Sequence, residues 1–249
     1  MHSLQPSTTL GAALMLLLTA ASLPAQASVT PDRTRLIFNE SDNSISVTLR
    51  NNDPKSPYLA QSWLEDAKGN KISSPLAVLP PVQRIDAMMN GQVKVQGLPD
   101  IHNLPADRES MFYFNVREIP PKSNTPNTLQ IALQTRIKLF WRPKALEKVD
   151  MRNPWQYKVT LTRAGQTFTV NNPTPYYVIL SNAGAKNDGS TAAGFSPLVI
   201  LPKTSQPLKV KMDSVPVLTY VNDYGARLPL FFHCAGDTCQ VDDAQSRKG

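Results

Sequence analysis

Hydrophobic and polar residues alternate along much of this chain, with the period of two that is typical of a strand buried on one face. The clearest case is residues 45–50, where Ile, Val and Leu alternate with Ser, Thr and Arg before an Asn-Asn-Asp-Pro turn. Further strands are predicted over residues 58–64, around Val93 and Val95, over 111–116, and over 129–141, the longest. This spacing predicts an immunoglobulin-like β-sandwich of about 100 residues.

The alternation stops after Trp141, where Arg-Pro is followed by the polar stretch Lys144 to Lys148. We place a domain boundary there. A second series of short strands is predicted over residues 157–161, 168–170, 176–180, 198–201, 208–212 and 228–234. The chain is therefore predicted to be all-β, with two tandem immunoglobulin-like β-sandwich domains over residues 28–143 and 144–249. Its 22 prolines and 11 glycines suit short strands separated by turns.

The first 27 residues have the features of a signal peptide that is cleaved before Ser28. They contain no charged side chain other than His2 when protonated, and an apolar stretch from Leu10 to Ala21 precedes Ala-Gln-Ala. That stretch is shorter than the roughly 20 residues that span a bilayer. An uncleaved anchor is the alternative. We expect an exported, soluble mature chain with no direct membrane insertion.

Export changes the interpretation of Cys234 and Cys239, the only two cysteines. A close pair in an oxidising compartment favours a disulfide between them. The alternative is a metal site, but two cysteines cannot hold a structural zinc alone, and His233 adds a third ligand only if it turns the same way. The prediction is a disulfide and no metal.

The net charge of +7 and the isoelectric point near 9.4 raise the question of an anionic partner. Residues 28–149 hold 16 basic and 12 acidic side chains, and residues 150–249 hold 10 and 7, so the excess is spread evenly. No basic run or nucleic-acid-binding motif accompanies it, which argues against nucleic acid. Neither His102 nor His233 lies near a nucleophile motif, and a Gly-rich phosphate loop is absent. No paired carboxylates stand out for glycosidic chemistry, although carboxylates distant in sequence can still meet in a fold. We predict neither an enzyme nor a cofactor.

Several stretches resemble the periplasmic pilus chaperones of the PapD type, and the resemblance covers the whole mature chain. In the first half these are Asp32-Arg-Thr-Arg35, Pro80-Pro-Val-Gln-Arg84, Arg108-Glu-Ser110 through Glu118-Ile-Pro-Pro121, and Leu129-Gln-Ile-Ala-Leu-Gln-Thr135 running on to Pro143. Asn172 to Tyr177 and Asn222-Asp-Tyr-Gly225 are similar in the second half. The resemblance implies a periplasmic chaperone that lends a β-strand to pilus subunits and delivers them to an outer-membrane usher. The short loop before Leu129 is similar to that of the short-loop subfamily.

The resemblance also implies roles for individual residues. It assigns Leu129, Ile131 and Leu133 to the donated strand that fills the subunit's groove, and Arg35 and Lys138 to the subunit's terminal carboxylate. The alternative for the strand is burial in the protein's own core. Lys138 lies at the opposite strand parity from Leu133, so both can face the subunit only across a bulge or a strong twist.

A second implied role is structural. Glu109, Arg142 and Asp223 match a charge network that ties the two domains together in the family. Without the resemblance, they would be interpreted as solvated surface charges.

Two other functions remain as alternatives. A pilus subunit or adhesin of the same system would have one incomplete domain and an N-terminal donor extension. A carbohydrate-binding sandwich would need clustered aromatic residues, whereas Trp63, Trp141 and Trp155 lie in three separate segments.

Overall fold

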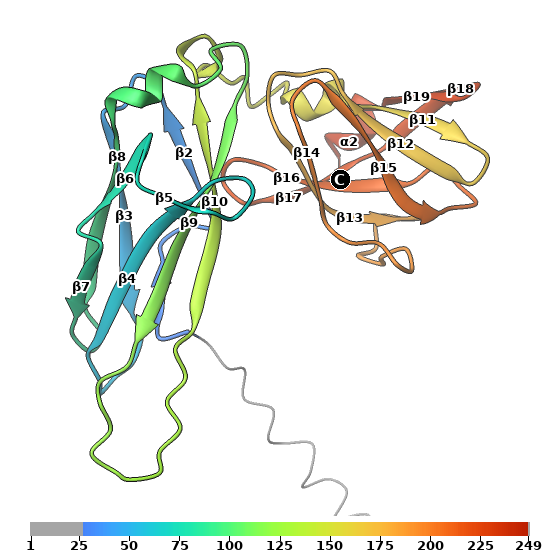
Figure 1. Cartoon of the computed structure of the whole chain (residues 1–249). Coiled ribbons are helices and arrows are strands. Elements are labelled where there is room, and N and C mark those ends of the chain that lie inside the picture. Colours follow the sequence, from blue (N-terminus) through green and yellow to red (C-terminus); the bar gives the residue numbers. More distant parts are fainter. Residues whose placement is uncertain (1–26, 249) are drawn as a thin grey trace, which may run out of the picture.

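The computed structural model describes residues 27–248 of the chain. The predicted signal peptide lies outside these residues except for Ala27, and its cleavage stays a prediction. Within the described part, no helix is long and apolar enough to cross a membrane. Figure 1 shows two β domains that meet at an angle, with the C-terminal domain beside one end of the elongated N-terminal domain.

Two sheets packed face to face form the N-terminal domain. The first has the order β1-β3-β8-β6, with β1 Val29–Pro31, β3 Ser44–Asn51, β8 Asn90–Gly97 and β6 Leu76–Leu79. The second has the order β2-β10-β9-β4-β5, with β2 Arg35–Asn39, β10 Gln134–Arg142, β9 Ser110–Ile119, β4 Tyr58–Glu65 and β5 Lys71–Ile72. Strand β7, Val82–Ile85, also pairs with β4, and the 3-10 helix η1 spans Pro99–Asn103.

Alternation along these strands builds the core of the N-terminal domain. Val47 and Leu49 of β3 and Leu139 of β10 are fully buried, and they pack with Phe38 and Phe114 from neighbouring strands. The polar residues between them face outward. The alternation along each strand therefore decides which face of a sheet packs against the opposite sheet.

The C-terminal domain repeats this architecture with a separate core. One sheet has the order β15-β12-β11-β19-β18, with β15 Thr204–Lys211, β12 Thr167–Asn172, β11 Thr160–Ala164, β19 Thr238–Val241 and β18 Phe232–Ala235. The other has the order β14-β13-β16-β17, with β14 Leu198–Ile200, β13 Val178–Gly184, β16 Val217–Val221 and β17 Arg227–Leu230. The helical pieces are the 3-10 turns η2 Lys144–Leu146 and η3 Trp155–Lys158, and the one-turn helix α2 Asp243–Ser246.

The predicted fold class is confirmed, because the described residues form nineteen strands in two sandwiches and almost no helix. Strand β10 of the first domain ends at Arg142, and β11 of the second begins at Thr160. The boundary placed after Pro143 stays a prediction.

Some of the predicted strands are wrong in extent. The strand predicted from Leu129 begins only at Gln134, because the residues before it extend past the sandwich and find no continuous ladder. Residues 157–161 begin as η3 rather than as a strand. The strand predicted over 228–234 is two strands, since β17 and β18 belong to different sheets.

Strand β2 escaped prediction because alternation alone does not identify it. Leu36 and Phe38 point into the core, but the intervening Ile37 is apolar as well. Its side chain packs at the contact between the domains, so both faces of this short strand meet hydrophobic surroundings.

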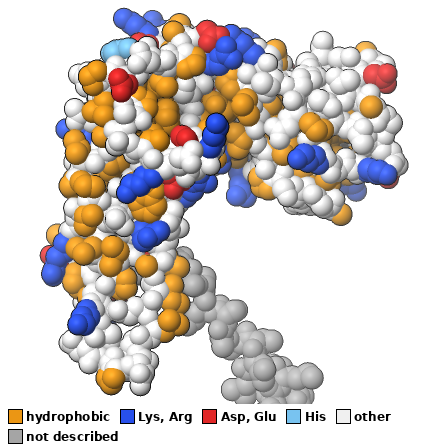
Figure 2. Space-filling view, viewed as in Figure 1, with side chains coloured by type: hydrophobic (Ala, Val, Ile, Leu, Met, Phe, Trp, Pro, Cys, Tyr) orange, Lys and Arg blue, Asp and Glu red, His pale blue; other side chains and the backbone are white. Residues whose placement is uncertain are grey.

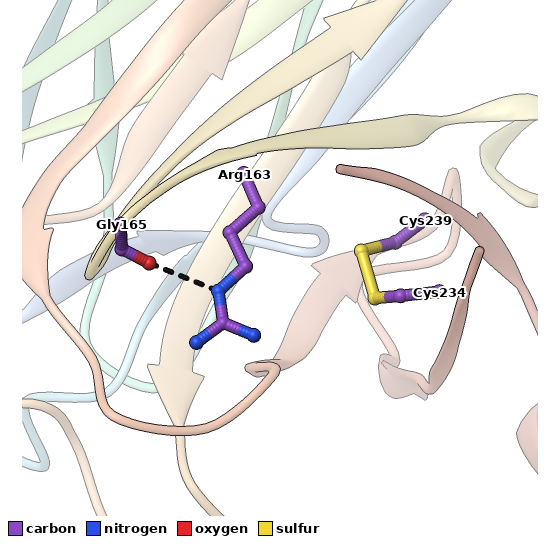
Figure 3. Close-up of a disulfide and its surroundings, with 4 residues drawn as sticks. All are labelled: Arg163, Gly165, Cys234 and Cys239. Atoms are coloured by element: carbon purple, nitrogen blue, oxygen red, sulfur yellow. Dashed lines mark hydrogen bonds between the residues drawn. A yellow bond between two sulfur atoms is a disulfide. The ribbon is translucent and has the colours of Figure 1, made fainter. Parts of the chain in front are cut away.

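The predicted disulfide is confirmed: Cys234 and Cys239 are bonded to each other and lie directly opposite on β18 and β19. Figure 3 shows this disulfide with Arg163 nearby, whose Nε donates a 2.9 Å hydrogen bond to the carbonyl oxygen of Gly165. Cys239 is fully buried in the core of the C-terminal domain, whereas Cys234 is partly exposed.

We expect replacement of both cysteines by Ala to lower the free energy of unfolding by only about 2 kcal/mol, because the bond closes a very short loop. Urea titration of the oxidised wild-type protein and of the double variant measures this difference. Mass spectrometry after alkylation without reduction should find no free thiol in exported protein. Two alkylated cysteines in that material would contradict the assignment.

Candidate functional site

The 127–133 segment, which precedes β10, carries three exposed aliphatic side chains spaced two residues apart. Leu129 is 84% exposed, Ile131 64% and Leu133 37%. These three residues therefore lie outside the core of their own domain. In Figure 1 the connection between β9 and β10 extends beyond the lower end of the sandwich, and Figure 2 shows hydrophobic side chains on this lower part of the domain. An exposed apolar stretch of this kind is normally an aggregation hazard.

One edge of β10 is only half covered. On one side, β10 pairs antiparallel with β9 from Gln134 to Trp141. On the other side, β2 pairs with it in parallel, but only from Lys138 to Arg142. Among the described residues, the stretch from Gln134 to Ile137 therefore has no strand beside this edge. Together with the 127–133 segment it offers a run of backbone groups to which another strand can be added.

Of the two devices that would let Leu133 and Lys138 face the same side, a bulge or a strong twist, a bulge is absent from β10. The ladder between β10 and β9 keeps its register from Gln134 to Trp141. Ile137, Leu139 and Trp141 point into the core, so Lys138 lies on the opposite, outward face. Leu133 precedes the ladder, where only its carbonyl oxygen accepts a 3.0 Å hydrogen bond from the N–H of Glu118. The alternation along β10 therefore does not determine which way the Leu133 side chain points.

Arg35 and Lys138 are direct neighbours across β2 and β10, and both are half-buried. Burial lowers the pKa of both groups, because desolvation disfavours their charged forms, and the charges of Arg35 and Arg136 lower the pKa of Lys138 further. Among the described residues, the buried Nε of Arg35 has no hydrogen-bond partner. Two adjacent, partly desolvated cations form a place where an anion is stabilised.

Arg136 lies on the same face of β10 but is already satisfied. Its Nε donates a 2.8 Å hydrogen bond to Glu65, and its guanidinium lies 3.5 Å from the centre of the Tyr113 ring. It therefore has much less to gain from an added anion than Arg35 has.

Glu109, Arg142 and Asp223 meet where the two domains join. The Arg142 guanidinium donates to Glu109 Oε1 at 2.7 and 2.9 Å, and to the two oxygens of Asp223 at 3.0 and 3.3 Å. The other oxygen of Glu109 accepts a 2.8 Å hydrogen bond from the N–H of Tyr177 in the C-terminal domain. One carboxylate and one guanidinium from the first domain are thus bonded to the second.

The Glu109 carboxyl is almost completely buried, and this burial raises its pKa to about 7. The charge of Arg142 and the N–H of Tyr177 act in the opposite direction and favour the ionised form. Without Arg142, this carboxylate would be buried with one backbone donor only. Arg142 therefore offsets the desolvation cost of burying the Glu109 carboxylate.

An apolar contact beside this network was not predicted. Met111 and Phe140 of the first domain and Ile179 of the second are buried together, and the rings of Phe140 and Tyr177 are 5.6 Å apart. A sequence signal for it was that Phe140, like Ile37 of β2, is apolar on the outward face of its strand, where a polar residue is the norm for a sheet facing water.

A third contact between the domains involves Gly225, in the loop after β16. Its φ of +87° is favourable only for glycine, and a Cβ there would lie 2.5 Å from Oγ1 of Thr34. This loop therefore packs closely against the bend that precedes β2.

A cavity of about 560 Å³ opens beside Arg35, between the start of β2, the segment that links the domains and the loop after β16. Its lining includes Arg35, Ile37 and Arg142 of the first domain and Asp223 and Tyr224 of the second. The cation with the unpartnered Nε therefore borders open space.

Comparison with known proteins gives a consistent result over nearly the whole chain. Residues 28–147 match the family model of the pili and flagellar-assembly chaperone PapD N-terminal domain. Residues 154–232 match that of the pili assembly chaperone PapD C-terminal domain.

Individual relatives agree with these matches. The chain is 80% identical over the full length of both chains to the probable fimbrial chaperone YfcS of Escherichia coli K12. It is 42% identical to the chaperone protein PapD of Escherichia coli, over 87% of this chain and 91% of that one. The SafB chaperone, solved in complex with the SafA pilin of Salmonella enterica, has the same fold: the TM-score is 0.66 at 22% identity, covering 82% of this chain and 95% of that one.

We expect Arg142→Ala to lower the free energy of unfolding by about 3 to 5 kcal/mol, because it leaves the Glu109 carboxylate buried without its guanidinium. Arg136→Ala is the matched control. It removes an ion pair whose arginine side chain is 40% exposed, so the expected loss is below about 1 kcal/mol. Urea titration of both variants measures the difference, and equal midpoints would contradict the role of the buried network.

Proposed function

Because this chain belongs to the family of PapD-type fimbrial chaperones of the chaperone-usher pathway, we propose that it captures pilus subunits by lending them its 127–133 segment as a β-strand. A subunit of this kind is an immunoglobulin-like fold without its last strand. Its core is therefore open along a groove that needs alternating apolar side chains. Leu129, Ile131 and Leu133 provide such side chains, spaced two residues apart and exposed to solvent.

The observation that carries the proposal is the half-covered edge of β10. A subunit strand added there takes the position that β2 occupies farther along the same edge. Because β2 begins at Arg35, opposite Lys138, a strand that approaches from the side of the 127–133 segment must end at that point. The geometry thus favours the end of a chain over the middle of one.

An incoming strand that is parallel to β10 ends there with its carboxyl terminus. Arg35 and Lys138 then meet the terminal carboxylate, which accepts charge-assisted hydrogen bonds from both. This contact fixes the register of the pair, because the subunit cannot slide along β10 without losing it. Backbone pairing does not depend on the subunit's sequence, so different subunits can bind, and the anchored terminus aligns each of them along β10.

The proposed partners are pilus subunits, including pilins and adhesins, and an outer-membrane usher that receives the complex. The SafB chaperone is known with a pilin bound, which supports this for a protein of the same fold. The predicted signal peptide supports a periplasmic location. We propose no catalytic role, no cofactor and no nucleic-acid partner.

The alternatives are less well supported. A pilus subunit or adhesin would have one incomplete domain, whereas each of the two domains described here has its own packed core. A carbohydrate site built on tryptophan is not favoured, because Trp141 and Trp155 are buried.

The 127–133 segment is tested by Ile131→Asp. We expect the free protein to keep its urea midpoint, because this side chain is 64% exposed, and to lose the chaperone–subunit complex, because the groove would have to bury a carboxylate. Ala132→Asp is the control, with the same charge on the neighbouring exposed residue. Co-purification of each variant with a co-expressed subunit measures the yield of complex.

A large drop in the urea midpoint of Ile131→Asp would show that the Ile131 side chain packs in the protein's own core. Equal loss of complex in both variants would show that added charge alone, and not the apolar face, prevents binding. Either result would contradict strand donation by this segment.

The carboxylate site is tested by Arg35→Ala and Lys138→Ala. Removing one partner of a desolvated charge pair costs about 2 to 5 kcal/mol of binding free energy. The expected loss of subunit affinity is therefore about 30-fold to several thousandfold. Lys211→Ala, at an exposed lysine of β15, is the control and should bind as the wild type does. Wild-type recovery of subunit by Lys138→Ala, with normal thermal melting, would show that the assignment is wrong.

A further inference from the structure

The cavity beside Arg35 is larger than a carboxylate needs. Its volume is about 560 Å³, which falls in the range of sites for small ligands. It extends from Arg35 between the two domains toward the linking segment that contains Val149 and Met151. A terminal carboxylate on Arg35 would fill only one end.

Most of the charged groups that line this cavity already have partners. Arg33 donates two hydrogen bonds to Asp32, Arg142 is bonded to Asp223, and Glu147 accepts from the N–H and hydroxyl of Ser41. Arg35 is different, because its buried Nε has no hydrogen-bond partner. One added anion would therefore be stabilised by Arg35, whereas a second charged group would find the other charged side chains already bonded.

The rest of the lining is apolar and partly uncovered. Ile37, Val149, Met151 and Tyr224 contribute to it. Met151 is 45% exposed and Tyr224 is 81% exposed, although both are large side chains beside a cavity. Contact with an apolar group would remove this surface from water, which is favourable.

We propose that this cavity receives the side chain of the subunit's last residue and selects a large apolar side chain over a charged one. The inference rests on the proposed function, because a strand that ends at Arg35 places its last residue beside the bend at residues 32–34. Arg33, Thr34 and Arg35 all line the cavity. The terminal carboxylate takes the unpartnered cation, and the neighbouring side chain takes the apolar wall.

A charged last side chain is disfavoured for a physical reason. It would lose water on entering the cavity, where Arg33 is paired with Asp32, Arg142 with Asp223, and Glu147 already accepts hydrogen bonds from Ser41. A small side chain would be tolerated but would leave the wall formed by Met151 and Tyr224 uncovered. The order of preference is therefore large apolar, then small, then charged.

The test uses the full mature protein and synthetic peptides of alternating apolar and polar residues that differ only at their last residue. Phe, Leu, Ala, Glu and Lys are compared there, each as a free acid, and the Phe peptide also as a C-terminal amide. Isothermal titration calorimetry measures each dissociation constant. We expect the Phe and Leu acids to bind about tenfold more tightly than the Ala acid, and the Glu and Lys acids to bind more weakly still.

Met151→Ala and Tyr224→Ala should reduce the preference for Phe over Ala while leaving the preference for acid over amide. Met88→Ala is the matched control, because Met88 is 51% exposed on the loop before β8, away from the cavity lining. Its preference should equal that of the wild type. Urea midpoints of all three variants should match the wild type, since these side chains are exposed.

The outcomes separate this inference from the proposed function. If acids bind better than the amide but the last residue makes no difference, the cavity is not a side-chain site and the carboxylate site stands. If Met151→Ala and Tyr224→Ala both keep the full preference for Phe, the assigned wall is wrong. If the acid and the amide bind equally, the carboxylate site fails and this inference fails with it.

Discussion

The parallel pairing of β2 with β10 begins at Arg35 and Lys138 and goes no farther toward the start of β10. This limit leaves the first residues of β10 and the preceding segment with a free edge, and it places two cations where the free edge ends. It also places the bend at residues 32–34 against the C-terminal domain, where the cavity opens. The proposed strand-donating edge, the proposed carboxylate site and the proposed side-chain cavity thus share one structural cause, the short length of β2.

The cavity exists only while the two domains keep their relative position, and buried charge holds them there at a cost in desolvation. Arg142 and Glu109 lose most of their hydration, and a well-packed apolar contact would stabilise the junction as much or more. A hydrogen-bonded ion pair adds a preferred direction, because Arg142 contacts both Glu109 and Asp223 in only one arrangement of the domains. Phe140 and Ile179 supply the apolar burial beside it. We infer that the network is retained for alignment more than for stability.

The sequence predicted the strands that separate core from solvent, because β3 and β4 have one face of each kind. It failed for β2, whose outward Ile37 faces the other domain, and for the start of β10, where an apolar alternation continues beyond the sandwich. Leu129, Ile131 and Leu133 have the pattern of a buried strand, so periodicity alone would place them in the core. An alternating pattern indicates that one face of a strand is shielded from water. It does not indicate whether the surface that covers this face belongs to the same chain or to a partner. Only the resemblance to a family indicated that the covering surface belongs to another chain.

An apolar segment kept exposed needs a device that opposes pairing between copies of the chain. Cations supply one here: Arg136 lies near the start of β10, Arg117 lies opposite that start on β9, and Lys122 lies in the connection that leads to the 127–133 segment. Two copies that aligned these edges would bring like charges together, and each copy also carries a net charge of +7. Under the proposed function, a subunit that brings a terminal carboxylate instead gains from the same positive field. The charge distribution therefore favours an anionic chain end over a second copy, while the backbone edge itself pairs with either.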